Sequence, residues 1–164
     1  MVFIHGVLHD HSVWILQSRY LAHHGWNVLA LDLPGHCRSA GDAPSSVEEA
    51  ADFIGGVLDA VGVQRAALVG HSWGSLIALE TASRLKARIS HLVLVGTAAS
   101  RFEVAPLPPA LHERSLVVYG EQDETVPLAS VMAWARPQSL PITVIPGVEH
   151  FFHGQLPLLK SLVA

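Results

Sequence analysis

A serine stands between two glycines in segment 69–74, which reads Val-Gly-His-Ser-Trp-Gly. Apolar residues at 66–69 favour a strand before it, and apolar residues at helical spacing favour a helix after it. A tight turn must then join strand to helix. Gly70 and Gly74 would leave room for the close approach, and Ser72 would be held strained with its hydroxyl outward. This pattern is typical of a nucleophile elbow, so Ser72 is the first candidate for catalysis.

A serine hydroxyl is a poor nucleophile at neutral pH and needs a base within hydrogen-bond reach. That base in turn needs a partner that fixes its tautomer. An acid and a histidine both follow the serine further along the chain. The backbone N–H of Trp73 would lie in the first turn of a helix, where unpaired donors and the helix dipole favour a developing negative charge. Trp73 would therefore supply half of an oxyanion hole.

Composition limits the class of protein. The chain has 164 residues, of which 50% are hydrophobic and 15% charged, and its mean hydropathy is +0.37. We expect a single domain over 1–164 with one well-formed core. The formal net charge is −4, without a block of Lys or Arg, so neither nucleic acid nor a membrane surface is an expected partner. A small-molecule substrate, neutral or amphiphilic, fits better.

Cys37 is the only cysteine, so no internal disulfide can form, and no signal sequence or spanning segment is evident. We therefore expect a cytoplasmic protein. Eleven histidines raise the question of a metal. Because no HExxH motif and no cysteine partner accompany them, we expect neither a metal site nor a cofactor.

Short β-branched runs alternate with helical patterns, which predicts an α/β fold. We expect a three-layer sandwich whose mostly parallel sheet of about six strands is flanked by helices. The predicted strands are Val2–Ile4, Asn27–Leu31, Ala66–Val69, His91–Val95, Ser115–Tyr119 and Ile142–Ile145. The predicted helices are His11–His24, Val47–Val61, Ser75–Leu85, Leu128–Ala135 and Leu156–Val163. Ser45 and Ser46, followed by two glutamates, indicate a capped helix start, and Ala105–Pro109 reads as a loop.

With these motifs the chain resembles the α/β-hydrolase superfamily over nearly all its length. His5-Gly6 looks like the family's oxyanion loop, which puts Val7 opposite Trp73 as the second backbone donor. Segment 32–39 is similar to the D-x-x-G-x-G-x-S turn, except that Cys37 stands where a second glycine is usual. The resemblance implies a triad of Ser72, Asp123 in the loop at 119–127, and His150 in the loop at 146–154.

Two departures from the family pattern stand out. The chain begins at the strand that resembles the oxyanion strand, so we expect the fold to lack the two antiparallel strands that usually come first. Only residues 96–114 bridge the strands where a helical cap is usually inserted, so the fold is expected to be capless. Residues up to Ala98 resemble capped ester and carbon–carbon bond hydrolases, whereas those from Arg101 are similar to small capless hydrolases. A recombined or engineered chain is one hypothesis for this difference.

Several candidates compete for the same roles. Glu121 or Glu124 could serve in place of Asp123, and His153 in place of His150. His71 is interpreted as a packing residue of the elbow. Asp10 and Asp32 are interpreted as loop and turn acids, and Cys37 is disfavoured as a nucleophile because no second base lies near it in the motif order. Five aromatic residues could line a substrate pocket or belong to the core: Trp14, Trp73, Phe102, Phe151 and Phe152.

The leading hypothesis is a cofactor-free serine hydrolase that cleaves carboxylic esters, with Gly6 and Phe151 as substrate-binding residues. Without a cap the site would be shallow, which favours short-chain esters. A thioesterase or a carbon–carbon bond hydrolase would use the same triad. A different class is a lapsed enzyme that acts as a small-ligand binding module, since fold does not guarantee function. The open edge at Asn27–Leu31 also predicts dimerisation with a second copy or aggregation.

Overall fold

A single parallel sheet forms the middle of the molecule. The computed structural model describes residues 1–164, and its six strands lie in the order β2-β1-β3-β4-β5-β6. All five neighbouring pairs are parallel. The strands are β1 (Val2–Ile4), β2 (Leu29–Ala30), β3 (Ala66–His71), β4 (Ile89–Val95), β5 (Ser115–Gly120) and β6 (Thr143–Ile145). The predicted α/β fold with six strands is confirmed.

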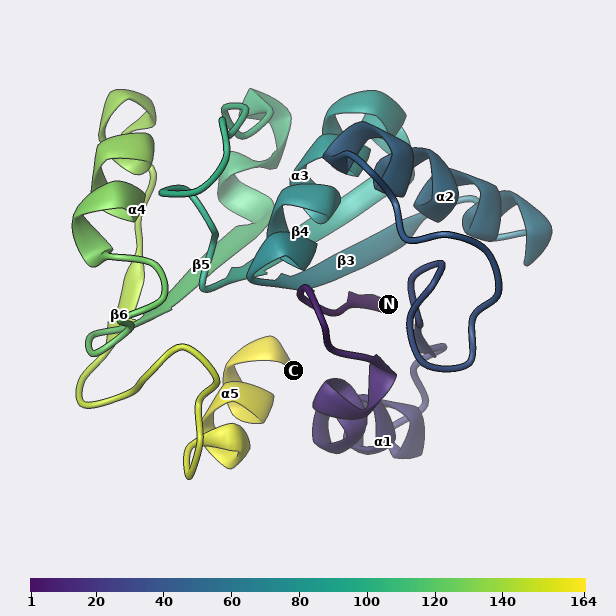
Figure 1. Ribbon diagram of the computed structural model, residues 1–164, viewed down its shortest axis with the longest axis horizontal. Coiled ribbons are helices and arrows are strands. Elements are labelled where there is room, and N and C mark those ends of the chain that lie inside the picture. Colours follow the sequence, from purple (N-terminus) through teal and green to yellow (C-terminus); the bar gives the residue numbers. More distant parts are fainter.

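Helices cover both faces of the sheet (Figure 1). The α-helices are α1 (Ile15–His23), α2 (Val47–Ala60), α3 (Trp73–Leu85), α4 (Leu128–Ala135) and α5 (Leu156–Val163). Short 3-10 helices lie at η1 (His11–Trp14), η2 (Lys86–Arg88), η3 (Pro109–Arg114) and η4 (Arg136–Gln138). Helices α2, α3 and α4 lie on one face of the sheet, and α1 and α5 on the other, so the three layers are as predicted.

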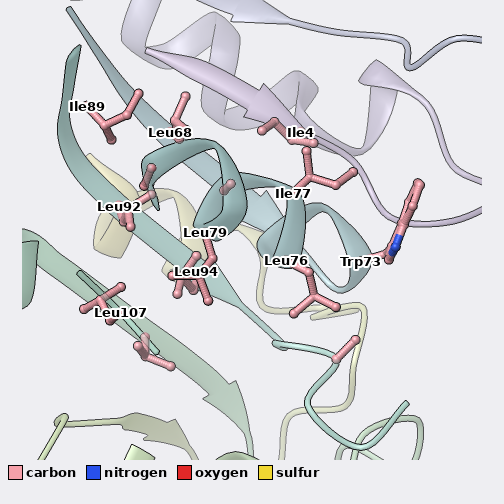
Figure 2. Close-up of a cluster of buried hydrophobic side chains, with 14 of the residues drawn as sticks. Ile4, Leu68, Trp73, Leu76, Ile77, Leu79, Ile89, Leu92, Leu94 and Leu107 are labelled. Atoms are coloured by element: carbon pink, nitrogen blue, oxygen red, sulfur yellow. The ribbon is translucent and has the colours of Figure 1, made fainter. Parts of the chain in front are cut away.

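Two apolar clusters hold these layers together, because alternate strand residues point to opposite faces. The larger cluster packs α3 residues such as Leu76 and Leu79 on strand residues such as Leu68 and Leu92 (Figure 2). The smaller cluster packs residues of η1, α1 and α5 on the opposite face. Phe3 contributes to the smaller cluster while its neighbours in β1 contribute to the larger one. The sheet is therefore buried on both sides and can hold its strand ends rigidly.

The strand order places a switch point between β1 and β3. The chain runs outward from β1 to β2, then returns to place β3 on the other side of β1. In open parallel sheets, ligands bind outside the carboxyl ends of the strands at such a point. The loops after β1 and β3 meet there, which brings Gly6 against Ser72.

Most element boundaries agree with the prediction, and the differences have local causes. Strand β2 is shorter than the predicted Asn27–Leu31, because it lies at the edge and pairs with β1 alone at Leu29 and Ala30. The predicted helix His11–His24 begins as the 3-10 helix η1, whose first turn is capped by the side chain of Asp10. The predicted helix Ser75–Leu85 begins earlier, at Trp73, directly after the turn. Residues 109–114, read as part of a connecting segment, form η3.

Two details of the prediction are confirmed. Ser46 caps α2 by accepting a hydrogen bond from the N–H of Glu49 at 3.1 Å, and Glu49 accepts from the N–H of Ser45 at 2.8 Å. The strand at residues 29–30 does lie at an open edge. Pairing of that edge with a second copy stays a prediction.

Gly70→Ala should destabilise the fold, because a Cβ at residue 70 would lie 2.6 Å from the Cα of Ser75 and closer still to the backbone of Gly74. Backbone cannot move aside as a flexible side chain can, so we expect the free energy of unfolding to fall by about 1–3 kcal/mol or more. Urea unfolding followed by circular dichroism measures this.

The matched control is Gly56→Ala on α2, where an added Cβ would meet nothing within 4 Å. Alanine in a helix interior should raise the free energy of unfolding by roughly 0.5–1 kcal/mol. Equal effects of the two substitutions would contradict the close approach of β3 and α3.

Candidate active site

Ser72 occupies the turn between β3 and α3 with a backbone that few L-residues adopt. Its φ is 55° and its ψ is −119°. The N–H of Ser72 donates to the carbonyl of Val95 at 2.8 Å, and the carbonyl of Ser72 accepts from the hydroxyl of Ser75 at 2.5 Å. These bonds hold the residue in a conformation that costs on the order of 1–3 kcal/mol. Ser72 is half-buried, at the carboxyl end of the sheet.

The loop after β1 lies directly against this serine. A Cβ at Gly6 would lie 3.2 Å from the Cβ of Ser72, and a Cβ at Gly74 would lie 2.5 Å from the carbonyl oxygen of His5. Side chains at these two glycines would separate the loop from the elbow. Glycine therefore allows the backbones of β1, β3 and α3 to converge at one point.

His5 fixes the shape of that loop, a role that the sequence analysis did not assign to it. The imidazole is fully buried, its Nε2 accepts from the N–H of Leu33 at 3.0 Å, and its Nδ1 donates to the carbonyl of Gly6 at 2.7 Å. These two bonds define one tautomer of the neutral ring. Burial lowers the pKa of His5, which favours that neutral form. The His-Gly dipeptide after a strand is the signal that could have identified this residue.

Asp123 and His150 form a buried pair. The Nδ1 of His150 lies 2.6 Å from Oδ2 of Asp123, and the residues are 3% and 7% exposed respectively. The other carboxylate oxygen of Asp123 accepts from the N–H groups of Thr125 at 2.9 Å and Val126 at 2.8 Å. With both oxygens engaged, the carboxylate is fixed in place and holds the imidazole with its Nε2 directed away from Asp123.

Gly96, at the end of β4, makes room for this pair. A Cβ there would lie 3.1 Å from both Cε1 and Nδ1 of His150, and the φ of Gly96 is 55°. The preceding residue, Val95, is the one whose carbonyl holds Ser72. The serine and the imidazole are thus anchored on consecutive residues of one strand end, a convergence that the sequence analysis did not find.

The loops that carry the acid and the base are fastened to each other. Backbone N–H groups of Glu121 and Gln122 donate to the carbonyls of Ile145 and Val148 at 3.0 and 2.9 Å. A Cβ at Gly120 would clash with the carbonyl of Val148. The spacing between Asp123 and His150 therefore depends on backbone contacts as well as on their own hydrogen bond.

The competing candidates occupy other positions. Glu121 is exposed and accepts from the N–H of Gly147 at 2.9 Å, and Glu124 is exposed. His153 has a side chain that is 79% exposed and lies 3.2 Å from a carboxylate oxygen of Glu149. None of these three residues belongs to a buried pair of a carboxylate and an imidazole, as Asp123 and His150 do.

His71 is buried, as expected for a packing residue of the elbow, and it also holds the loop that carries His150. Its Nε2 donates to the carbonyl of His150 at 2.8 Å, and the two imidazole centroids are 4.7 Å apart. Burial first, and then the neighbouring His150, lower the pKa of His71 to about 4. His71 is therefore neutral at pH 7 and supports His150 without adding a charge beside it.

The two residues predicted to supply backbone donors for an oxyanion hole line one groove. Trp73 is the first residue of α3 and is 8% exposed, while Val7 follows Gly6 and is 51% exposed. A groove of about 820 Å³ begins at these two residues and extends between α3 and the segments at 43–48 and 102–106. Phe102 is one of its walls. A larger groove of about 1010 Å³ lies at the opposite ends of the strands, around Val2 and Ser115, away from this chemistry.

Phe151 lies beside His150. Its ring is 40% exposed and meets the imidazole of His150 edge-on at 5.0 Å between centroids. Phe152 and Trp14, the other aromatic candidates on this side, are 1% and 2% exposed and belong to the smaller apolar cluster. Trp73 is part of the larger cluster.

The remaining polar candidates order loops. Asp10 accepts from the N–H of Ser12 at 2.7 Å, and Asp32 accepts from both the N–H and the Nδ1 of His11 at 2.8 Å. Cys37 is exposed with a φ of 47°, in the region that favours glycine. His11, Asp32 and Cys37 place one metal-capable atom each within 4.8 Å of one another, although His11 and Asp32 already bond with each other.

A family model described as alpha/beta hydrolase fold matches residues 1–113 of this chain. The chain therefore belongs to the alpha/beta hydrolase fold family. Its sequence is similar to the dihydrolipoyllysine-residue acetyltransferase component of the acetoin cleaving system of Cupriavidus necator, with 34% identity over 97 residues. That match covers 58% of this chain and 26% of the relative. The chain is also 29% identical over 118 residues to epoxide hydrolase 3 of Xenopus tropicalis, covering 69% of this chain and 29% of that protein.

The chain thus spans less than a third of the length of these curated relatives. Among solved structures, it is similar to an a/b serine hydrolase without lid from Xanthomonas campestris, with a TM-score of 0.81 and 25% identity. The similarity covers 99% of this chain and 77% of that one. None of the helices in the structure has the length and apolar character needed to cross a bilayer.

The buried His71 predicts a loss of stability in acid. Its folded pKa of about 4 lies below the value of about 6.5 expected in the unfolded chain, so the unfolded state binds more protons between these two pH values. The free energy of unfolding should fall as the pH drops from about 6.5 to about 4, with a contribution from His71 on the order of 3 kcal/mol.

His71→Gln should flatten this pH dependence, measured by urea unfolding at pH 7, 6, 5 and 4.5. His91→Gln on β4 is the matched control, because His91 is exposed. A slope that His71→Gln leaves unchanged would mean that His71 is not the group responsible.

Proposed function

We propose that this protein is a serine hydrolase that cleaves short-chain carboxylic esters through an acyl-enzyme on Ser72. The observation that carries the proposal is the convergence at the end of β4: Ser72 is held by Val95, and the buried His150–Asp123 pair packs on Gly96. A strained serine and an imidazole oriented by a carboxylate, both held at the end of one strand, are what nucleophilic acyl transfer requires. The similarity to a serine hydrolase without lid supports the same reaction class.

In the proposed reaction His150 accepts the hydroxyl proton of Ser72 through Nε2 as the serine oxygen attacks the acyl carbon. The ionised Asp123 stabilises the imidazolium that forms. The oxyanion would accept hydrogen bonds from the backbone N–H groups of Val7 and Trp73. His150 then gives the proton to the leaving alcohol, and water, activated by the same imidazole, releases the acid.

The groove that begins at Val7 and Trp73 suits an acyl group. Its walls include Leu76 and Val104, and it lies beside the positions proposed for the oxyanion donors. Because no helical cap is expected over it, the groove would hold short acyl chains better than long ones. Gly6 has no side chain between the loop and Ser72, so it would let a substrate approach the serine closely.

A thioesterase or a carbon–carbon bond hydrolase would use the same triad and differ only in the bond placed beside Ser72. The chain is also similar to an epoxide hydrolase and to an acetyltransferase component, so its relatives are named for more than one type of reaction. Comparing p-nitrophenyl acetate with an acetyl thioester as substrates separates the esterase from the thioesterase. A folded protein that hydrolyses neither substrate would favour a small-ligand binding module.

Ser72→Ala should abolish release of p-nitrophenol from its acetate and butyrate esters, with a loss of turnover on the order of a millionfold, because the triad acts as a unit. A fluorophosphonate should add one label to the wild-type protein, located at Ser72 by mass spectrometry. Ser83→Ala, on the exposed side of the same helix, is the matched control and should retain both activity and label. Turnover equal in wild type and Ser72→Ala would contradict the proposal.

Asp123→Asn should lower kcat by a factor on the order of 10⁴ while preserving the fold, because an amide cannot hold the imidazole in the tautomer that leaves Nε2 free. Steady-state kinetics with p-nitrophenyl acetate measures the effect. Glu124→Gln on the same loop is the control, since Glu124 is exposed. A larger loss in Glu124→Gln than in Asp123→Asn would assign the acid differently.

A further inference from the structure

Three side chains with different metal-binding atoms meet outside the candidate active site. A ring nitrogen of His11, a carboxylate oxygen of Asp32 and the sulfur of Cys37 all lie within 4.8 Å of one another. His11 is the first residue of η1, whereas Asp32 and Cys37 belong to the segment that follows β2. The two segments are separate in the sequence, so only the fold brings this donor set together. The proposed reaction uses none of the three residues.

Asp32 is the fixed member of this cluster. Its Oδ1 accepts a hydrogen bond from the backbone N–H of His11 at 2.8 Å and lies 2.8 Å from Nδ1 of the same residue. The hydroxyl of Ser39 donates to the carbonyl of Asp32 at 2.6 Å and closes the turn around it. The side chain of Asp32 is 11% exposed, against 45% for that of His11, and Cys37 is exposed as well. One ligand is therefore held in place, and the other two reach the surface, where they are free to move.

The separations of the three atoms are close to those of a zinc site. In a tetrahedral site with bonds of about 2.0–2.3 Å, nitrogen and oxygen ligands lie about 3.3 Å apart, and a sulfur ligand lies about 3.6 Å from each. Nδ1 of His11 and Oδ1 of Asp32 are 2.8 Å apart, so they need to separate by about half an ångström. The sulfur of Cys37 needs to approach by at most about 1.2 Å. Small rotations of two surface side chains are enough for shifts of this size.

The donor set determines which ion fits. Imidazole and thiolate are ligands of zinc, whereas magnesium and calcium take oxygen ligands almost alone. A thiolate and a carboxylate together balance the charge of a divalent cation. Asp10 places a further carboxylate near His11 and Asp32, held by the backbone N–H of Ser12 at 2.7 Å. The surroundings of the cluster therefore also favour a cation.

We propose that His11, Asp32 and Cys37 form a zinc site that ties η1 to the turn after β2. Cys37 binds as the thiolate and releases its proton to solvent. His11 binds through Nδ1, the nitrogen that faces Asp32, and carries its proton on Nε2. Water takes the fourth position, because Cys37 lies at the surface. The zinc stays divalent throughout, and the site does not depend on the proposed esterase reaction.

Zinc at this position would stabilise a turn that also supports the active-site loop. Leu33, the neighbour of Asp32, donates its N–H to Nε2 of His5 at 3.0 Å, and Nδ1 of His5 donates to the carbonyl of Gly6 at 2.7 Å. A metal bound to the folded protein stabilises it by mass action. We therefore expect zinc to raise the melting temperature of the protein, by about 5 °C or more at a concentration of 100 Kd.

The first test measures affinity. Zinc chloride is titrated into the reduced, metal-free protein in competition with a chromophoric chelator, and we expect one zinc per chain with a Kd on the order of 1 μM. Cys37→Gly removes the sulfur and also relieves a φ of 47°, so this variant keeps the fold. It should weaken binding at least about tenfold, since loss of an outer-shell partner alone typically costs about 10–100-fold. It should also abolish the rise in melting temperature.

The matched control is His23→Ala, at an exposed histidine of α1. It should bind zinc as tightly as the wild type does, because His23 is not one of the three ligands. Magnesium chloride in place of zinc chloride should neither bind with comparable affinity nor raise the melting temperature.

The second test follows the sulfur directly. Cys37 is the only cysteine, so mass spectrometry of the protein during treatment with iodoacetamide reports the reaction rate of this one thiol. Zinc at 100 Kd should slow alkylation at least about tenfold, because a sulfur bound to zinc is not free to react. His11→Gln should remove this protection although the thiol is still present, which links the sulfur to the imidazole through the metal.

Three results would overturn the zinc site. Equal affinity in the wild type and in Cys37→Gly would assign the zinc to an adventitious ion on other histidines. Equal protection of the thiol in the wild type and in His11→Gln would mean that zinc binds the sulfur without the imidazole. Lack of zinc binding by the wild type in the chelator competition would overturn the site directly. Because none of these measurements uses ester hydrolysis, their outcome is separate from that of the proposed function.

Discussion

Close approach of three backbones at the carboxyl ends of β1 and β3 is the constraint on which the site depends. A Cβ on Gly74 would press into the end of β1, and one on Gly70 would press into the first turn of α3. With glycine at both positions, α3 can begin immediately after Ser72, and the loop at Gly6 can lie against it. The strained φ of Ser72 is the local consequence of this convergence. The apolar packing of α3 on the sheet offsets the free-energy cost of that strained backbone.

The remaining parts of the site depend on the same edge. Strand β4 contributes Val95, which holds the serine, and Gly96, which admits the imidazole. Backbone bonds between the loops after β5 and β6 then set the separation of Asp123 and His150. Each of these loops leaves the sheet at the end of a strand that is paired along its length. A parallel sheet with both faces buried therefore acts as the rigid base that positions the connections after β1, β3, β4, β5 and β6.

Buried histidines make this edge polar without making it charged. His5 and His71 are both buried, and burial lowers the pKa of each, so both are neutral near pH 7. Each uses its neutral ring to fix a backbone carbonyl, at Gly6 and at His150. Neither His5 nor His71 therefore adds a positive charge beside the pair of His150 and Asp123. The lowered pKa values keep both rings uncharged near pH 7. They also make the folded state less stable in acid, where the unfolded chain binds more protons.

Local pattern alone determined the fold class, the elbow at Ser72 and nearly all the helices and strands. Those features depend on residues close together in the chain: apolar periodicity, the glycines around Ser72, and the serine that caps α2. Resemblance to a family added Asp123 and His150, which the residues alone left in competition with Glu121, Glu124 and His153. Tertiary structure distinguished them, because only packing decides which carboxylate and which imidazole are buried together. It also decided the roles of His5, His71 and Gly96 and the short pairing of β2. These depend on contacts between segments distant in sequence, and such contacts leave no periodic signal in the chain.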